Sequence, residues 1–305
     1  MMYHVLSCDQ FSRADLEGIF RLTDNIRAQP RAFRTALAGK IVATVFYEPS
    51  TRTRLSFEAA VLRLGGTVIS TENAKEMSSA IKGESLPDTI RVIGGYCDAI
   101  VLRHPDIRSA EDAARVSQVP VLNAGSGSGE HPTQAVLDVY TIYQYKQKID
   151  GLKVAVLGDL LFGRTVHSLV KLLALYEDIT IYGLSHDVLS LPEDYSAYLE
   201  ARGIRYIPCR SLPEIPPEVD VLYHTRTQTE RFANTDLPIE EFVIDKKALD
   251  YFSPHTILMH PLPRRNEIAP DVDGDRRAVF FAQSHYGMYV RMSLLHSILK
   301  QDSEG

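Results

Sequence analysis

Apolar and polar residues follow two recurring patterns along this chain of 305 residues. Short continuous apolar runs such as residues 40–47 and 98–103 are rich in valine, isoleucine and other strand formers, which is typical of buried β-strands. Longer stretches such as residues 13–29 carry apolar side chains at helical spacing and predict amphipathic helices. Because strands and helices alternate, we expect parallel sheets with right-handed crossovers.

The predicted elements form two successive α/β series. The first series has strands at 40–47, 67–70, 98–103 and 119–123, with helices at 13–29, 52–64, 86–94, 108–117 and 131–148. The second series has strands at 153–158, 178–183, 204–208, 219–225 and 256–260, with helices at 164–176, 193–202 and 287–300. We expect two tandem doubly wound α/β domains with parallel sheets, and we place their boundary on the helix at 131–148. The sequence alone leaves open which domain the last helix packs against.

Residues 72–82 interrupt this regular order. They are polar, show no periodicity and reach no glycine before Gly83. Connections in α/β units usually span about 2–6 residues, so this segment is long for its place in the fold. Long polar loops are either functional or disordered.

Composition narrows the class of protein. The chain is 45% apolar and 24% charged, which is ordinary for a globular protein, and its length suggests about two domains. A net charge of −6 without any run of lysine and arginine argues against a nucleic-acid partner. The three cysteines are widely spaced, residues 1–30 show no signal-peptide core, and no apolar stretch reaches the roughly 18–20 residues that cross a bilayer. We therefore expect a cytoplasmic protein with reduced thiols and no membrane contact.

Polar clusters follow six of the predicted strands. They comprise residues 50–54, 103–105, 125–134, 158–165, 224–228 and 260–264. Open parallel sheets bind their ligands beyond the carboxyl ends of the strands. One such cluster could be a routine loop, but six at equivalent positions indicate a binding site.

Residues 50–54, Ser-Thr-Arg-Thr-Arg, join the first strand to a helix. The backbone N–H groups and the positive dipole end of a helix N-terminus favour an anion. Hydroxyl and guanidinium groups added there make a cradle for a phosphate. The alternative is that Ser50 caps the helix and that both arginines lie on a solvated face.

The sequence lacks the motifs of several common kinds of binding site and catalytic site. The glycines of residues 125–129 and 158–163 do not match the dinucleotide-binding fingerprint, and there is no P-loop. The histidines form no metal-binding motif, and no serine or cysteine lies at a recognisable spacing from a base. His131 is a candidate site residue or a satisfied loop histidine. His260 is interpreted as structural, in a rigid proline loop whose carbonyl oxygens lack helical partners.

The remaining candidates are cations and amides rather than acids and bases. They are Arg52, Arg54, Lys82, Arg103, His131, Gln134, Arg164 and Arg226. Such a set suits two anionic substrates held together while a developing oxyanion is stabilised. Arginine also suits the bidentate recognition of carboxylate and phosphate groups. Acyl or phosphoryl transfer between small acids fits this set, and spacing alone does not choose between them.

These motifs together resemble the aspartate/ornithine carbamoyltransferase family. The resemblance rests on residues 50–54, on His-Pro-Thr-Gln at 131–134 and on His-Pro-Leu-Pro-Arg at 260–264, and it runs essentially end to end. Residues 225–228, Thr-Arg-Thr-Gln, are similar to the members that use aspartate, whereas the ornithine enzymes carry a cysteine in the loop after His260. Leu161 and residues 283–287 depart from the family's usual pattern.

The resemblance implies a transferase of pyrimidine biosynthesis that moves the carbamoyl group of carbamoyl phosphate to the amine of L-aspartate. Residues 1–133 with 287–305 would bind carbamoyl phosphate, and residues 134–286 would bind aspartate. The active site would lie between these domains, with the last helix packing back on the first. No cofactor and no metal is implied.

The implied contacts fall into three overlapping groups. Carbamoyl phosphate would be bound by Ser50, Thr51, Arg52, Thr53, Ser78, Arg103, His131, Gln134, Leu262 and Pro263. Aspartate would be bound by Lys82, Arg164, Arg226 and Gln228. The catalytic residues would be Arg52, Thr53, Lys82, Arg103 and His131. Glu48 is expected to pair with Arg164 or Arg231.

Partners are also implied by the resemblance. The 72–82 loop would reach a neighbouring protomer, so Ser78 and Lys82 would act in trans in a homotrimer with shared active sites. A regulatory chain or another pathway enzyme is left open as a further partner. Two alternatives remain, a carbamoyltransferase for a different amino acid and a non-catalytic binding homologue. The first requires a loss among the aspartate-binding residues and the second a decay of the phosphate-binding residues, and the sequence shows neither.

Overall fold

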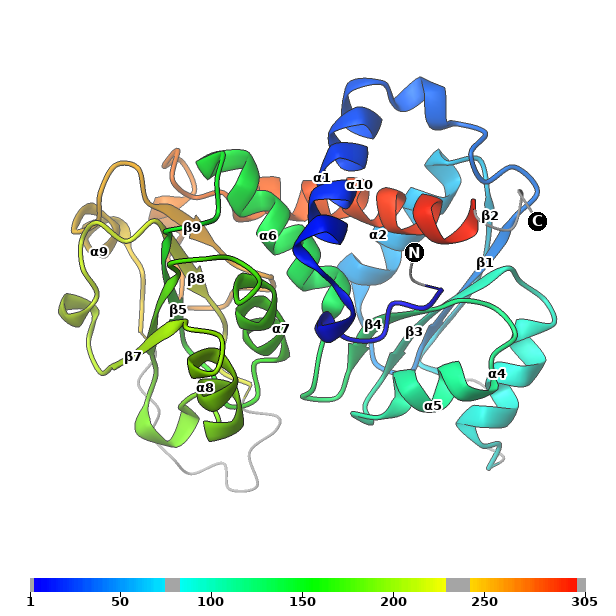
Figure 1. The fold of residues 1–305 in the computed structure, drawn as a ribbon, viewed down its shortest axis with the longest axis horizontal. Helices are drawn as coiled ribbons and strands as arrows, with labels where there is room; N and C mark the ends of the chain where they lie inside the picture. Colours follow the sequence, from blue (N-terminus) through cyan, green and yellow to red (C-terminus); the bar gives the residue numbers. More distant parts are fainter. Residues whose placement is uncertain (1–2, 75–82, 229–241, 301–305) are drawn as a thin grey trace. The chain divides into compact units, whose positions relative to one another are not determined.

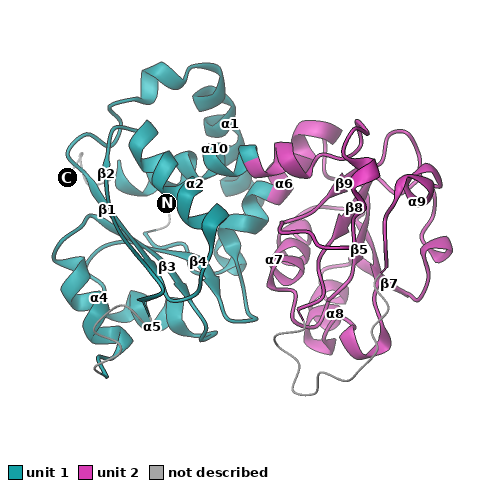
Figure 2. Ribbon diagram, turned by 180° about the vertical axis from the view of Figure 1, so that it is seen from behind, with its two compact units in different colours: residues 1–137, 285–305 teal, residues 138–284 magenta. Residues whose placement is uncertain are grey.

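The computed structural model describes residues 3–74, 83–228 and 242–300. Most of the predicted 72–82 loop, including Ser78 and Lys82, lies outside the described residues. The chain divides into two compact units, coloured teal and magenta in Figure 2. Unit 1 comprises residues 1–137 and 285–305, and unit 2 comprises residues 138–284.

Unit 1 is built on a four-stranded parallel sheet with the strand order β2-β1-β3-β4. Its strands are β1 (Ile41–Phe46), β2 (Thr67–Glu72), β3 (Ala99–His104) and β4 (Val121–Ser126). Its helices are α1 (Arg13–Ala28), α2 (Thr51–Arg63), α4 (Leu86–Gly94) and α5 (Ser109–Val116), with short 3₁₀ turns at Cys8–Gln10 and Pro30–Phe33. The predicted strands and helices of the first series are therefore present, with ends that differ by a few residues.

Helices cover both faces of this sheet (Figure 1). Ile90 of α4 and Ala113 of α5 pack in one buried cluster with Val45 and Ile100 of the central strands. Helices α1 and α2 lie on the opposite face of the sheet. The first helix begins as predicted, because the Ser12 side chain accepts a hydrogen bond from the Asp15 amide in a capping box.

Unit 2 is built on a five-stranded parallel sheet with the order β7-β6-β5-β8-β9. Its strands are β5 (Lys153–Leu157), β6 (Thr180–Leu184), β7 (Arg205–Cys209), β8 (Val221–His224) and β9 (Ile257–Met259). Its helices are α7 (Arg164–Leu173), α8 (Glu193–Glu200) and α9 (Lys246–Asp250), with 3₁₀ turns at Asp187–Leu189, Leu212–Glu214 and Pro270–Val272. The prediction of two doubly wound α/β domains is confirmed.

Two helices, α6 (Pro132–Lys146) and α10 (Phe280–Leu299), belong to both units. The predicted start of α10 at Gly287 is wrong, because the helix begins earlier and Gly287 lies inside it. A Cβ atom on Gly287 would lie 2.7 Å from Arg291 Nη1 and 2.9 Å from Leu137 Cδ2. The glycine therefore allows close packing within the helix layer and does not mark a helix end.

The C-terminal part of α10 packs on unit 1, as the resemblance implies. Ser293 Oγ lies 2.8 Å from the buried Thr23 Oγ1 of α1. The Arg291 guanidinium lies over the Phe57 ring of α2, 5.1 Å from its centroid. Among the described residues, no helix is long and apolar enough to span a membrane.

In each sheet, the direction of winding reverses at one point. The reversal lies between β1 and β3 in unit 1 and between β5 and β8 in unit 2. Loops that follow the two strands at such a point leave toward opposite faces, and the crevice between them is where open α/β sheets bind ligands. Two crevices are therefore expected, one beyond each sheet.

Candidate active site

The loop that leads from β1 into α2 carries the predicted phosphate cradle. Ser50 occupies the N-cap position of α2, but its side chain makes no capping hydrogen bond. Thr53 is buried, whereas Thr51 and Arg52 are exposed. The capping alternative for Ser50 is not what the structure shows. The Ser50 side chain therefore does not occupy the first-turn amides of α2, which remain the natural donors for an anion.

Arg54 points away from this cradle, toward the edge strand β2. Its guanidinium lies 3.1 Å from Glu58 Oε1 and 2.9 Å from Glu72 Oε2, and it also donates to Ser70 Oγ. Glu58 accepts a further hydrogen bond from Thr44 of β1. Arg54, a candidate site residue in the sequence, thus ties the first turn of α2 to the sheet and supports the cradle from behind.

Arg103 comes from β3, the neighbour of β1 at the winding reversal. It pairs with Phe46, the last residue of β1, so its side chain leaves the sheet next to the cradle. Its Nε lies 3.4 Å from Glu48 Oε2 in a partly buried ion pair. Glu48 therefore pairs with Arg103 inside unit 1, and Arg231, one of its two expected partners, lies outside the described residues.

His131 and Gln134 follow β4 at the same edge of the sheet. Both side chains are buried, and His131 Nδ1 lies 3.4 Å from Thr133 Oγ1. The preceding glycines have a packing role. Gly127 has φ +49°, and a Cβ atom there would lie 2.6 Å from the Pro105 carbonyl oxygen. The glycine run thus lets the loop pack against the loop after β3 and needs no nucleotide to explain it.

In unit 2, a buried carboxylate organises the loops at the winding reversal. Asp159, just after β5, has an exposed fraction of 0%. Its Oδ1 accepts from the Phe162 amide at 2.8 Å, and its Oδ2 accepts from the Gln228 amide at 3.0 Å. Burial raises the pKa of Asp159, and these two backbone hydrogen bonds oppose that rise. The loop after β5 is thereby joined to the loop after β8.

Two of the predicted aspartate-binding residues, Arg164 and Gln228, meet at the Phe162 carbonyl oxygen. This oxygen accepts from Gln228 Nε2 at 2.7 Å and from the Arg164 amide at 2.9 Å. Arg164 is buried and opens α7. Arg226 is half-buried and donates to the Thr227 carbonyl oxygen at 3.3 Å. The structure thus brings Arg164 and Gln228 together, with Arg226 two residues before Gln228 in the loop after β8, and Lys82 lies outside the described residues.

Close contact between β5 and β8 is built into the backbone. Gly158 has φ +105°, and a Cβ atom there would lie 2.1 Å from the Thr225 carbonyl oxygen. Leu262 and Pro263 follow β9, the next strand of the sheet, and Leu262 has φ +54°. The Leu262 amide donates to His260 Nδ1 at 2.8 Å. The unit 2 site is therefore defined by the loops after β5, β8 and β9.

Sequence reasoning missed Asp159 and Glu267. The signal available for Asp159 was its place directly after a strand and before a glycine-containing turn, a pattern shared with ordinary loops. Glu267 lies beyond the motif at residues 260–264 and carries no local signal. Within the described part of the chain, no group of His, Cys, Asp and Glu side chains is suited to hold a metal ion.

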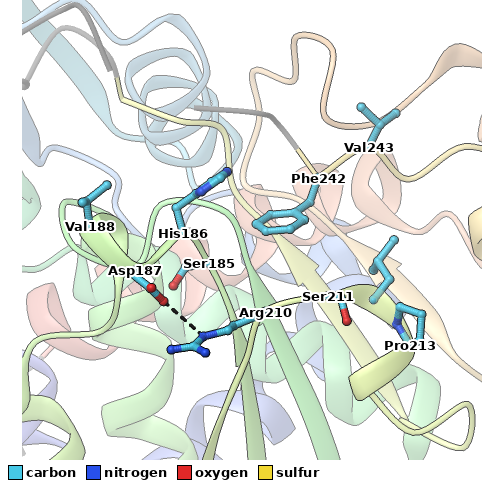
Figure 3. A pocket seen from close by; sticks show the side chains of 10 residues that line it. Ser185, His186, Asp187, Val188, Arg210, Ser211, Pro213, Phe242 and Val243 are labelled. Atoms are coloured by element: carbon cyan, nitrogen blue, oxygen red, sulfur yellow. Dashed lines mark ion pairs between the residues drawn. The ribbon is translucent and has the colours of Figure 1, made fainter. Parts of the chain in front are cut away.

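A cavity of about 680 Å³ opens at the carboxyl ends of β6 and β7 in unit 2 (Figure 3). Asp187 and Arg210 face each other across it with an ion-pair distance of 3.4 Å, and both are highly exposed. The rings of His186 and Phe242 lie 5.4 Å apart on its wall. None of the predicted site residues that the structure describes lines this cavity, so it is distinct from the unit 2 site.

Comparison with known proteins shows similarity along nearly the whole chain. Residues 3–144 match the model of the aspartate/ornithine carbamoyltransferase carbamoyl-P binding domain, and residues 150–298 match that of the Asp/Orn binding domain. The chain is 46% identical to the chloroplastic aspartate carbamoyltransferase of Oryza sativa subsp. japonica, over 97% of this chain and 84% of that protein.

Solved structures show the same similarity. The catalytic subunit of M. jannaschii aspartate transcarbamoylase superposes with a TM-score of 0.91 at 44% identity and covers 100% of both chains. Aspartate transcarbamoylase from Trypanosoma cruzi, solved with carbamoyl aspartate and phosphate, superposes with a TM-score of 0.90 at 40% identity, over 97% of this chain and 95% of that chain.

Proposed function

The chain belongs to the aspartate/ornithine carbamoyltransferase family, and from this premise we propose that it transfers the carbamoyl group of carbamoyl phosphate to the amine of L-aspartate. The products are N-carbamoyl-L-aspartate and phosphate, and the reaction serves pyrimidine synthesis. The choice of aspartate rests on one observation. At the winding reversal of unit 2, the Phe162 carbonyl oxygen accepts hydrogen bonds from the Gln228 side chain and the Arg164 amide, which brings these two residues together. Cationic and amide groups suit a dicarboxylate, whereas the cationic groups would repel the ammonium group of a basic side chain.

In this proposal carbamoyl phosphate binds the unit 1 site, which consists of the loops after β1, β3 and β4. The amides and side chains of residues 50–53 hold its phosphate at the positive end of α2, where the absence of a capping bond from Ser50 supports the role. Arg103 bridges the phosphate and the carbonyl oxygen, and His131 contacts that oxygen. Gln134 and the carbonyl group of Leu262, next to Pro263, hold the carbamoyl nitrogen.

Aspartate binds the unit 2 site, with its carboxylates held by Arg164, Arg226 and Gln228. Ser78 and Lys82 complete the binding of the two substrates from a neighbouring chain, so the active protein is a homotrimer with shared sites. We place the enzyme in the cytoplasm, in keeping with three cysteines that are present as thiols.

The reaction proceeds by direct attack. The lone pair of the neutral aspartate amine adds to the carbamoyl carbon, and the carbonyl π electrons move onto oxygen. Thr53, Arg103 and His131 stabilise that oxyanion, and Arg52 stabilises the charge on the phosphate. The tetrahedral intermediate collapses as the carbon–oxygen bond to phosphate breaks, and the leaving phosphate takes the amine proton. No protein base is required.

One assay tests this function. The purified chain is given carbamoyl phosphate with a panel of amino acids, and the release of phosphate is followed. Among the amino acids of the panel, only aspartate is expected to give rapid turnover with carbamoyl phosphate. Turnover with a different amino acid would favour another carbamoyltransferase, and no turnover by folded trimers would favour a binding homologue.

Shared active sites have a separate test. Arg52→Ala and Lys82→Ala chains are each expected to be inactive as pure trimers. After dissociation and mixing, hybrid trimers regain part of the activity if each site takes Arg52 from one chain and Lys82 from another. Hybrids without activity would contradict the shared site.

A further inference from the structure

The loop after β9 contains a buried histidine–glutamate pair. His260 and Glu267 each have an exposed fraction of 1%, and His260 Nε2 lies 2.8 Å from Glu267 Oε1. On the other side of the ring, Nδ1 accepts the Leu262 amide at 2.8 Å. A backbone amide can only donate, so Nδ1 carries no proton. His260 is therefore neutral, with its single ring proton on Nε2 and directed at Glu267.

Glu267 is held as a carboxylate. Its second oxygen, Oε2, accepts from the Arg265 amide at 2.9 Å. Burial raises the pKa of Glu267, but the hydrogen bonds from His260 and from the backbone outweigh burial and leave the pKa below its ordinary value. The carboxylate thus fixes the tautomer and the orientation of the His260 ring, as carboxylates do for histidines that act on a third group.

The backbone of His260 is fixed by a second buried set of contacts. Its amide donates to Gln283 Oε1 at 3.0 Å, and Gln283 Nε2 donates to Asp138 Oδ1 at 2.7 Å. Asp138 Oδ2 accepts from the Tyr223 hydroxyl at 2.7 Å. The sequence marks Gln283 only as part of an unusual segment, and the structure makes it an anchor of this loop.

These contacts converge on Leu262. A left-handed φ is uncommon for a residue with a branched side chain and persists where surrounding contacts impose it. The ring of His260 supplies such a contact at the amide of the same residue whose carbonyl group faces the carbamoyl nitrogen in the proposed function. A non-glycine residue with a left-handed φ has only a narrow range of allowed ψ, so a contact that holds Leu262 in this conformation through its amide also restricts the direction of its carbonyl group.

We propose that Glu267 and His260 are positioning residues that aim the Leu262 carbonyl oxygen, and that this oxygen selects the NH₂ group of carbamoyl phosphate over the methyl group of an acyl phosphate. The inference rests on the proposed function, because it takes carbamoyl phosphate as the substrate. An acceptor aimed at NH₂ gains a hydrogen bond with a carbamoyl group and is left unpaired by a methyl group.

A matched pair of variants separates the positioning contact from mere packing. In His260→Asn the side-chain oxygen reaches about the position of Nδ1 and can accept the Leu262 amide. In His260→Gln the amide group reaches about the position of Nε2, which keeps a contact to Glu267 and loses the one to Leu262. Calorimetry measures the dissociation constants of carbamoyl phosphate and acetyl phosphate for each variant.

The ratio of these two constants is the readout. His260→Gln is expected to lower the preference for carbamoyl phosphate about tenfold, the effect of one hydrogen bond, whereas His260→Asn keeps most of it. Equal losses in both variants, or no loss in either, would overturn the proposal. If His260→Gln fails to fold, Glu267→Gln replaces it and is expected to lower the same ratio by a smaller factor, with an unchanged ratio counting against the proposal.

Hydrogen exchange at the Leu262 amide tests the positioning contact independently of the proposed function. Hydrogen–deuterium exchange of a peptide that spans Leu262 reports its hydrogen bond whether or not the chain is active. Faster exchange is expected in His260→Gln than in His260→Asn. A wild-type chain that transfers no carbamoyl group to aspartate refutes the function, whereas an active chain with equal exchange in both variants refutes the positioning pair.

Discussion

The unit 1 site and the unit 2 site occupy the same topological position in their sheets, but they are supported differently. In unit 1, the supporting ion pairs of Arg54 with Glu58 and Glu72 are partly exposed, with side-chain exposures of 17–34%. In unit 2, Asp159 and Glu267 are almost completely buried and accept hydrogen bonds from backbone amides.

The difference follows from what each site is made of. A helix N-terminus supplies the anion-binding groups of unit 1, and a helix is rigid without help from side chains. The unit 2 site consists of loop residues, whose conformation has to be imposed by other groups. We therefore expect unit 1 to depend on its ligand-binding residues and unit 2 to depend as strongly on the residues behind them.

The largest effect is expected from Arg52→Ala. Arg52 is exposed at the first turn of α2, so its removal should leave the melting temperature unchanged. Loss of a charge partner of the transition state should lower kcat by about 10³-fold. Arg63→Ala, an exposed arginine at the other end of the same helix, is the control and should retain wild-type kinetics. Kinetics of Arg52→Ala close to those of the control would remove the phosphate cradle from the catalytic site.

Glu267 should make the unfolding free energy of unit 2 depend on pH in the acidic range. Its pKa is about 2 in the folded chain, against an ordinary value of 4.5. A carboxyl group whose pKa is depressed by folding stabilises the protein above the ordinary value, and this stabilisation is lost as the pH falls from about 4.5 toward 2. Between pH 5.5 and pH 2, the wild type should lose about 3 kcal/mol more unfolding free energy than Glu267→Gln in urea titrations. Parallel curves for the two proteins would show that Glu267 is not held as a carboxylate.

Asp159→Asn tests the other buried carboxylate of unit 2. An asparagine has one acceptor oxygen, so it leaves either the Phe162 or the Gln228 amide without its present partner. That cost is about 1.5–3 kcal/mol, and we expect the KM for aspartate to rise about 10- to 100-fold. The dissociation constant of carbamoyl phosphate, measured without aspartate, should stay within a factor of about two. A proportional rise in both would mean that the two sites do not have separate supports.

The elements of this fold could be predicted because their signals are local. Helix α1 begins at Arg13 as predicted, with Ser12 as its cap, and the polar clusters lie beyond the strands that precede them. Gly287 misled the prediction of α10, since a glycine that permits close packing looks the same in sequence as one that ends a helix. Strand order depends on contacts between distant segments, so neither winding reversal could be read from the sequence.

The same difference between local signals and distant contacts decides which parts of the candidate sites could be predicted. Residues 50–54 are contiguous and carry both the helix start and its ligand groups, so the sequence shows this part of the unit 1 site. Asp159 and Glu267 act on backbone amides of loops, and no residue type is required at the amide that they bind. Their role is therefore visible only once the loops are placed in space.

The smallest effect is expected from Glu58→Gln in unit 1, the counterpart of Asp159→Asn. Its side-chain oxygen can still accept from Thr44 and Ser70, and Arg54 keeps its contact to Glu72 at 2.9 Å. Partly exposed ion pairs contribute about 0–1 kcal/mol, so the unfolding free energy should fall by less than about 1 kcal/mol, and by less still in high salt. Carbamoyl phosphate affinity should change less than about threefold, because the helix itself presents the first-turn amides. A loss as large as the one expected for aspartate in Asp159→Asn would show that the unit 1 site also depends on the groups behind it, and the contrast between the two units would fail.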